Sequence, residues 1–178
     1  IWLGRKEKIN TKKDFPDLIV YGDKAYGKIC ISFAAAGDFN GDGIDDFMMS
    51  AAFRDSEREG EFLEQTGSVY IVYGGQFKFE KGKTIQIRAE DIGSKVKGIH
   101  IGAENDGSAY LGYANGLESG DINGDGISDL VISSYNPYES ETRIPHFAPR
   151  AYIIFGSKHK AKPYGKIWLD DKNPKPLD

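Results

Sequence analysis

The sequence predicts an all-β fold in which a unit of four antiparallel strands is repeated in tandem. An apolar strand that closes on glycine occurs three times, as IWLG at 1–4, IVYG at 71–74 and IIFG at 153–156. An acidic loop occurs twice, as GDFNGDGIDD at 37–46 and GDINGDGISD at 120–129. The 178 residues include 22 glycines, ten tyrosines and ten phenylalanines, a composition typical of short strands joined by turns. Self-similarity of this kind indicates one supersecondary unit used more than once.

The elements of the unit follow the same order in both copies. Each copy opens with a short apolar segment, followed by a segment with a glycine near its start and then by the acidic loop. Next comes a run of apolar and small residues with the length of a buried strand. A long polar loop then leads to the glycine-ended strand. In order, the segments are DLIVYG (17–22) or GIHIGA (98–103), YGKICISFAAAGD (26–38) or LGYANGLESGD (111–121), and DFMMSAA (46–52) or DLVISS (129–134).

The acidic loops carry oxygen-bearing residues at alternate positions, as a hard cation with several oxygen ligands requires. Glycines between these positions can take the positive φ angles of a tightly wrapped loop. We predict that each loop binds one Ca²⁺ through side-chain oxygens at positions one, three, five and nine and a main-chain carbonyl at position seven. The expected ligands are Asp38, Asn40, Asp42, Ile44 and Asp46 in the first loop, and Asp121, Asn123, Asp125, Ile127 and Asp129 in the second.

Two other interpretations of the loops are weaker. An EF-hand begins in the same way but needs a bidentate glutamate at position twelve and flanking helices. Position twelve is Met49 in one loop and Ile132 in the other, and strand-like runs follow both. Asp, Asn and Gly also favour solvated turns without any metal. An ordinary turn, however, does not need acids at positions one, five and nine in both copies.

Charge and cysteine content exclude several classes of protein. The net charge is −4 without a long block of either sign, and two Ca²⁺ would cancel it, so nucleic acid is not an expected partner. The single cysteine, Cys30, is expected to be a small buried hydrophobe, and no disulfide framework exists. No apolar run approaches the length of a membrane span, so we expect no membrane insertion in this segment. Any secretion signal would have preceded residue 1.

Catalytic chemistry is not expected in this chain. The three histidines, His100, His146 and His159, are scattered, and no GxSxG or HExxH motif occurs. The adjacent acids Asp45 and Asp46 have different expected roles, one pointing outward and the other binding the ion. We therefore predict that the chain is not an enzyme.

The repeat resembles the FG-GAP repeats of integrin α-subunit β-propellers. Tyr26-Gly27 and Leu111-Gly112 stand where the family has Phe-Gly, and Ser50-Ala51-Ala52 and Ser133-Ser134-Tyr135 stand where it has Gly-Ala-Pro, while the DxNxDGxxD loop is intact twice. The resemblance implies four-stranded antiparallel blades of a partial β-propeller with calcium-binding loops between strands. It divides the chain into the end of a preceding blade (1–25), a repeat with the first loop at 38–46 (26–102), and a repeat with the second loop at 121–129 and the start of the next element (103–178).

The end of the blades opposite the acidic loops is the expected recognition surface. In an up-and-down blade, successive connections emerge at alternate ends, so the long loops at 54–67 and 136–150 lie away from the metal. The first long loop is mostly charged, so we expect it to be solvated. The second is rich in aromatic residues, proline and arginine, which recognition surfaces favour, although packing against its own blade is the alternative. The predicted partner-binding residues are Tyr138, Phe147 and Arg150.

The resemblance implies an extracellular, cell-surface or periplasmic calcium-binding module for protein recognition, adhesion or assembly. Its partner is expected to be another protein, or further blades or subunits that cover the open ends. Two alternatives stay open at this point. The chain is also compatible with a non-catalytic accessory propeller of a secreted phospholipase or polysaccharide-active enzyme, and with a structural subunit of an envelope or extracellular complex.

Overall fold

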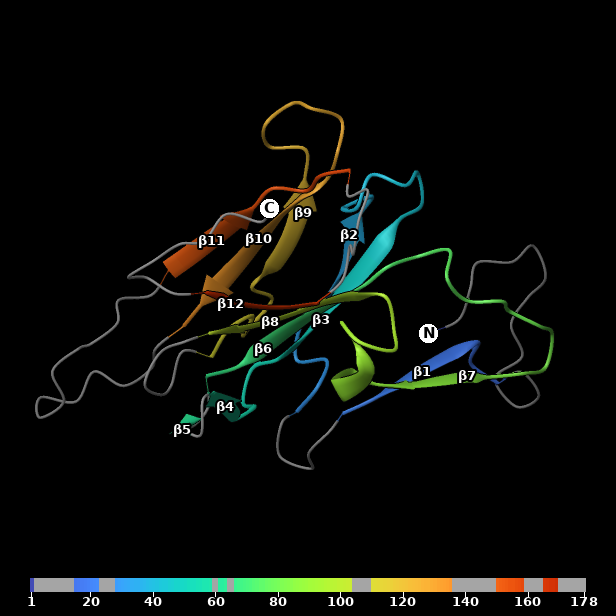
Figure 1. Ribbon diagram of the computed structural model, residues 1–178, viewed down its shortest axis with the longest axis horizontal. Helices are drawn as coiled ribbons and strands as arrows, with labels where there is room; N and C mark the ends of the chain where they lie inside the picture. The colour runs from blue at the N-terminus through green and yellow to red at the C-terminus, as the bar shows by residue number, and fades with distance from the viewer. Residues whose placement is uncertain are drawn as a thin grey trace, which may run out of the picture.

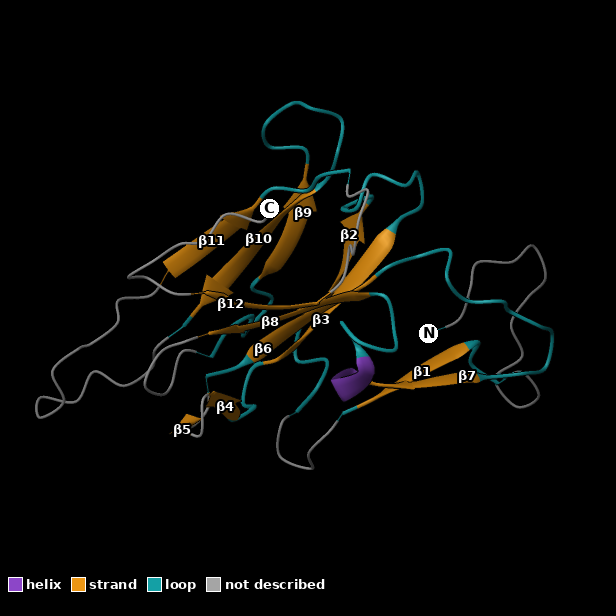
Figure 2. Cartoon of the chain, viewed as in Figure 1, coloured by secondary structure: helices purple, strands orange, loops and turns teal. Residues whose placement is uncertain are grey.

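The computed structural model describes residues 1, 15–22, 28–58, 61–63, 66–103, 110–135, 150–158 and 165–169. These residues form strands and one short 3-10 turn, which confirms the all-β prediction (Figures 1 and 2). The elements are β1 (Leu18–Tyr21), β2 (Phe33–Gly37), β3 (Asp46–Ala51), β4 (Ser56–Arg58), β5 (Glu61–Leu63), β6 (Ser68–Val72), β7 (Ile85–Arg88), η1 (Ala89–Asp91), β8 (Gly98–Ala103), β9 (Leu117–Gly120), β10 (Asp129–Ser134), β11 (Arg150–Ile154) and β12 (Gly165–Leu169).

The first sheet contains the predicted unit of four antiparallel strands. β2, β3, β6 and β8 follow one another as neighbours, and each pair is antiparallel. β8 is the GIHIGA segment, which the repeat order placed at the start of the second unit; it instead completes the first sheet. Gly98 permits this pairing, because a Cβ there would lie 2.0 Å from the carbonyl oxygen of Ile71.

The second sheet repeats the first three strands of this unit. β9, β10 and β11 are neighbours in the order β11-β10-β9, with both pairs antiparallel. The two sheets lie side by side through their first strands, where the hydroxyl of Ser119 on β9 donates to the carbonyl of Ala35 on β2 at 2.9 Å. Two similar antiparallel sheets thus lie next to each other along β2 and β9, as repeats in tandem predict. Among the described residues the second sheet has three strands where four were predicted.

Two parallel strands were not predicted from the sequence. β7 pairs in parallel with β1, and β12 pairs in parallel with β8 as the fifth strand of the first sheet. In both repeats the strand after the glycine-ended strand therefore pairs in parallel with a strand from earlier in the chain. In the second repeat this strand, β12, joins the outer strand of the first sheet and so fastens the second repeat to the first.

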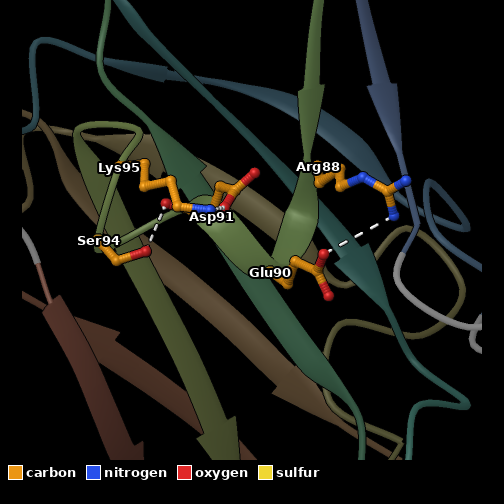
Figure 3. A network of polar contacts seen from close by, with 5 residues as sticks. All are labelled: Arg88, Glu90, Asp91, Ser94 and Lys95. Carbon is orange, nitrogen blue, oxygen red and sulfur yellow. Dashed lines mark hydrogen bonds and ion pairs between the residues drawn. The ribbon is translucent and has the colours of Figure 1, made fainter.

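A compact turn carries the chain from β7 to β8 (Figure 3). The carbonyl of Asp91 accepts a hydrogen bond from the hydroxyl of Ser94 at 3.0 Å, and the Asp91 carboxylate pairs with Lys95 at 2.8 Å. Arg88 and Glu90 approach each other at 3.7 Å on the surface. Exposed ion pairs contribute little stability. The turn is anchored mainly by Ile92, which is fully buried beneath it.

Two apolar cores cover the two faces of the first sheet. The core between the two sheets includes Met48 and Ile71 from the first and Leu130 and Ile132 from the second. The core on the opposite face packs Met49, Tyr70 and Val72 against β1, β7 and the turn after it. Successive side chains of β3 thus point into different cores, as expected for a strand that is buried on both faces.

Three expectations about loops and surfaces change with the structure. Cys30 is exposed and not buried, because it lies in the turn before β2 with φ of 65° and not within the strand. The first long loop, expected to be a solvated loop, contains the short hairpin β4–β5. Tyr138 and Phe147 lie outside the described residues, whereas Arg150 begins β11 and is half-buried. In the part of the chain that the structure describes, no helix has the length and apolar character to cross a membrane.

Candidate metal centre

The two acidic loops occupy equivalent places in the two sheets. The first connects β2 to β3 and the second connects β9 to β10, and Figure 1 shows both at the same edge of the molecule. All four inner glycines have positive φ, at 68° for Gly41, 87° for Gly43, 77° for Gly124 and 85° for Gly126. This confirms the wrapped conformation predicted from the sequence.

The first loop is wound around its own side-chain oxygens. The Asp38 carboxylate accepts hydrogen bonds from the main-chain N–H groups of Asp42 at 2.8 Å and Gly43 at 2.9 Å. The side-chain carbonyl of Asn40 also accepts from the N–H of Asp42, and the Asp42 carboxylate accepts from the N–H of Ile44, both at 2.9 Å. The residues at positions one, three and five therefore turn their oxygens toward the inside of the loop.

The second loop repeats these four bonds and adds one, from the N–H of Gly124 to the Asp121 carboxylate at 2.8 Å. The Asp121 carboxylate accepts from Asp125 at 3.0 Å and from Gly126 at 2.9 Å. Asn123 accepts from Asp125 at 3.0 Å, and Asp125 accepts from Ile127 at 2.9 Å. Two independent copies with the same bonds show that the conformation is a property of the motif and not of its surroundings.

The acids at position nine fasten each loop to a neighbouring strand. Asp46 is 3% exposed, and its two oxygens accept from the N–H groups of Phe39 at 3.1 Å and Gly74 at 2.9 Å. Asp129 is fully buried and accepts in the same way from Ile122 at 2.8 Å and Gly156 at 2.9 Å. These two carboxylates therefore link the start of the loop to the end of the glycine-ended strand.

The glycines that end β6 and β11 belong to the site, and the sequence analysis did not assign them to it. A Cβ at Gly74 would lie 2.3 Å from the carbonyl oxygen of Asp45, and one at Gly156 would lie 2.2 Å from that of Ser128. Only glycine lets the strand approach the loop closely enough to bond the buried carboxylate. The sequence signal that could have pointed to Gly74 and Gly156 was the glycine-ended strand, which occurs three times.

Among the described residues no ion pair joins an acid of the loops to a basic side chain, although the Lys158 side chain lies next to Gly41 of the first loop. The ion pairs seen elsewhere involve Glu80, Glu90 and Asp91, all outside the loops. Burial raises the pKa of the Asp46 carboxyl to about 6, and the charge of Asp42 adds to this effect, while main-chain N–H donors oppose it. An oxygen-rich, electronegative loop of this kind has the donor chemistry that Ca²⁺ prefers.

The fit to calcium rests on donor chemistry and on loop shape. Within the described residues, no three acidic, imidazole or thiol groups converge as a ready cage for a metal. The carboxylates of each loop instead accept N–H groups. Most of their oxygens accept one N–H and keep a second lone pair that an ion can use, whereas Asp121 Oδ1 and Asp129 Oδ2 each accept two. Asn40, Asn123 and the main-chain carbonyls of Ile44 and Ile127 would supply the neutral oxygens. The residues present thus fit calcium as a donor set.

The two loops differ in how the fold covers them. In the first, Phe39 is fully buried and Asn40 is 8% exposed, because the second sheet lies against them. The N–H of Ser128 donates to the carbonyl of Asp38, and that of Ser157 donates to the carbonyl of Phe39, both at 3.2 Å. In the second loop, Ile122 is 49% exposed. One loop is part of a contact between sheets and the other borders open surface.

The opposite end of the sheets carries an aromatic cleft that the sequence analysis did not identify. It has a volume of about 690 Å³ and is lined by Phe53, Tyr110, Tyr113 and Tyr135. Phe53 meets Tyr110 and Tyr113 edge to face, with centroids at 5.2 and 5.5 Å, and Tyr113 stacks on Tyr135 at 5.7 Å. The Lys28 ammonium lies 4.4 Å from the centre of the Phe53 ring. The cleft therefore lies at the end where a recognition surface was predicted.

Antiparallel sheets with an acidic loop after the first strand and a glycine-ended third strand define a blade-type repeat protein. Residues 32–72, which run from the start of β2 to the end of β6, match the FG-GAP repeat family. This confirms the FG-GAP resemblance seen in the sequence: residues 32–72 carry an FG-GAP repeat.

Two curated relatives are integrin α proteins of nematodes. The chain is 29% identical over 118 residues to integrin alpha pat-2 of Caenorhabditis briggsae, and 27% identical over 119 residues to integrin alpha pat-2 of Caenorhabditis elegans. Each alignment covers 66% of this chain and 8% of the relative. The chain is thus comparable to a small part of those proteins.

Proposed function

We propose that this chain is a calcium-stabilised β-propeller module for protein recognition, adhesion or assembly, with no catalytic role. The observation that carries the proposal is the pair of acidic loops, which share one hydrogen-bond pattern and whose acids form no ion pair among the described residues. Similarity to integrin α proteins supports a recognition module. An extracellular, cell-surface or periplasmic setting suits calcium loops of this type, which work at high calcium concentration.

In this proposal the ion acts on stability. Bound calcium supplies positive charge to loops whose own residues are acidic. Asp38, Asn40, Asp42 and Ile44 would hold it in the first loop, while Asp46 would both bind the ion and keep its bond to Gly74. The second loop would use Asp121, Asn123, Asp125, Ile127 and Asp129 in the same roles. The expected result is a loop locked onto the third strand of its own sheet.

Titration with Ca²⁺ is expected to show two sites. Three carboxylates in a preformed loop suggest dissociation constants on the order of 10⁻⁴ to 10⁻³ M. Isothermal calorimetry of the chain, with Asp42→Ala/Asp125→Ala as the control that removes one ligand from each loop, measures this directly. The absence of calcium-specific heat in the unchanged chain, or equal heat in the double variant, would contradict the proposal.

Calcium should also raise the stability of the chain. An ion that binds only the folded state stabilises it by RT ln(1 + [L]/Kd), which is about 1 to 3 kcal/mol at ten to a hundred times Kd. Chelation should therefore lower Tm, and Asp42→Ala or Asp125→Ala should each remove roughly half of the calcium response. Thermal melts with calcium and with chelator test this, and a Tm indifferent to chelator would reject it.

We propose that the partner surface lies at the end of the sheets with the aromatic cleft. Tyr and Phe rings provide large contact area at low entropic cost, which is why they are frequent in recognition sites. Tyr135 lines the cleft and directly precedes the loop that carries Tyr138 and Phe147, two of the predicted partner-binding residues. Arg150 follows the same loop. No observation favours the accessory-propeller or envelope-subunit alternatives over this one.

A further inference from the structure

The outer face of the second sheet is apolar and exposed. Its residues point away from the core between the sheets, because they alternate along the strands with the buried residues Leu130, Ile132 and Ile154. Ile122 is 49% exposed, and Ile153 and Phe155 are each 53% exposed. We call this surface the trailing face and define it by Ile122, Val131, Ile153 and Phe155.

The same positions in the first sheet are buried by the neighbouring sheet. The repeats align through their acidic loops and glycine-ended strands, and the strand registers agree: Met48 pairs with Ile71 on β3–β6, and Val131 pairs with Ile153 on β10–β11. The counterparts of the trailing face are Phe39, Met48 and Ile71, all fully buried, and Tyr73, which is 2% exposed. All four lie in the core that the second sheet covers.

The first sheet shows the complementary surface. Phe33 is 53% exposed and stacks on the half-buried Phe47 at 5.7 Å. By strand register their counterparts in the second sheet are Leu117, 3% exposed, and Leu130, fully buried, which press against the first sheet. We call the surface of Phe33 and Phe47 the leading face. The contact between the two sheets is therefore a trailing face on a leading face. The second sheet keeps its trailing face open, whereas β1 and β7 already cover Met49 and Val72 beside the leading face, so Phe33 and Phe47 are the part of that side left exposed.

We propose that copies of this chain associate head to tail, with the trailing face of one copy on the leading face of the next. A second copy of the chain is the partner that fits these faces, because the same pair of faces already forms the core between the two sheets within one chain. Ile1 already hydrogen-bonds the main chain of Leu18, so the edge of β1 is left out of the proposed contact. The association would be driven by burial of apolar residues between matching repeats, and it does not require bound calcium.

A head-to-tail contact uses two different surfaces, so it produces either a closed ring or an open filament. Propellers close with roughly four to eight blades. Because each copy contributes two sheets, a closed ring contains about two to four copies. For a chain of 19.7 kDa this corresponds to a mass of about 39 to 79 kDa.

Two acidic residues weaken the contact between copies relative to the contact within the chain. Glu118 is exposed opposite Val131 on β10, at the place that Ala34 occupies in the first sheet. Asp45 stands where Ser128 lies against Gly37 at the existing contact. Glu118→Ala and Asp45→Ser should therefore tighten self-association, each by several-fold, because they restore the residues found at the contact already formed.

Sedimentation velocity of the 178-residue chain over a range of concentrations tests the proposal, with and without calcium. The unchanged chain should form species of two to four copies, and Phe155→Glu and Phe33→Glu should each raise the dissociation constant at least about tenfold. Tyr135→Glu is the matched control, because Tyr135 is similarly exposed, at 47%, but stacks on Tyr113 in the lining of the cleft and belongs to neither face as defined. Circular dichroism confirms that each variant folds.

Mixing the two variants separates a head-to-tail contact from general stickiness. A Phe155→Glu copy keeps its leading face and a Phe33→Glu copy keeps its trailing face, so an equal mixture should form a dimer that neither forms alone. Loss of association only with Phe155→Glu would indicate a symmetric contact and overturn the proposal. A chain that stays monomeric even with Glu118→Ala and Asp45→Ser would also overturn it, whatever calorimetry shows for calcium.

Discussion

Replacing Leu130 by alanine should lower the free energy of unfolding by about 2 to 5 kcal/mol. Leu130 is fully buried in the core between the sheets, directly after the last acid of the second loop. Truncation leaves a cavity that neither sheet can close without moving, so the lost transfer free energy and the lost packing add together. This is a large share of the stability of a small domain.

Chemical denaturation at low protein concentration measures the effect, with Ile153→Ala as the control. Ile153 is aliphatic and lies one residue from Ile154, the partner of Leu130 in the strand register, but it is 53% exposed. Its truncation should cost well under half as much. If both variants lost the same stability, the second sheet would not be docked on the first as described.

Replacing Asp46 by alanine should cost about 3 kcal/mol even when calcium is chelated. The substitution removes the acceptor for two N–H groups and leaves the buried N–H of Phe39 and the partly buried N–H of Gly74 without a partner. Unmade buried hydrogen bonds cost more than the average made bond contributes. The acid at position nine thus has a structural role that is separate from any ion.

Asp42→Ala is the matched control for this experiment. Asp42 is exposed, and its carboxylate bonds only residues of its own loop, Ile44 and Asn40. In chelator its removal should cost less than about 1 kcal/mol, while in calcium it should cost more. Asp46→Asn should lie between the two, because one carbonyl oxygen remains to accept an N–H. Equal losses for Asp42→Ala and Asp46→Ala in chelator would show that the two acids have the same role.

The repeat in the sequence predicted most of the fold that surrounds the candidate site. Alternating acids and glycines in the two loops indicated their wrapped shape, and the glycine-ended strands marked the third strand of each sheet. The parallel strands β7 and β12 were not predicted, because a short segment such as IQIR, in which apolar and polar residues alternate, carries no signal for which strand it will pair with. Cys30 was wrongly expected to be buried, because a turn with positive φ interrupts an apolar run without any glycine.

The sequence could not predict which side chains on the faces of the sheets are buried. Ile71 and Ile153 are the same residue at the same place in the repeat, yet one is fully buried and the other 53% exposed. The difference comes from the neighbouring sheet and not from the residue or its strand. The roles of Gly74 and Gly156 were missed for a similar reason, since only the folded chain shows the carboxylate that their N–H groups meet.

The return of β12 to the first sheet also matters for how the chain folds during synthesis. β12 joins β8 in parallel although it is made roughly 60 residues later than its partner. As the ribosome adds residues in order, β8 is therefore an outer edge of the sheet while the second repeat is being made, and exposed edges are the places where chains pair wrongly. In a nascent chain of this design, the first sheet receives its last strand only when the next repeat has been synthesised. Neighbouring repeats must therefore fold together.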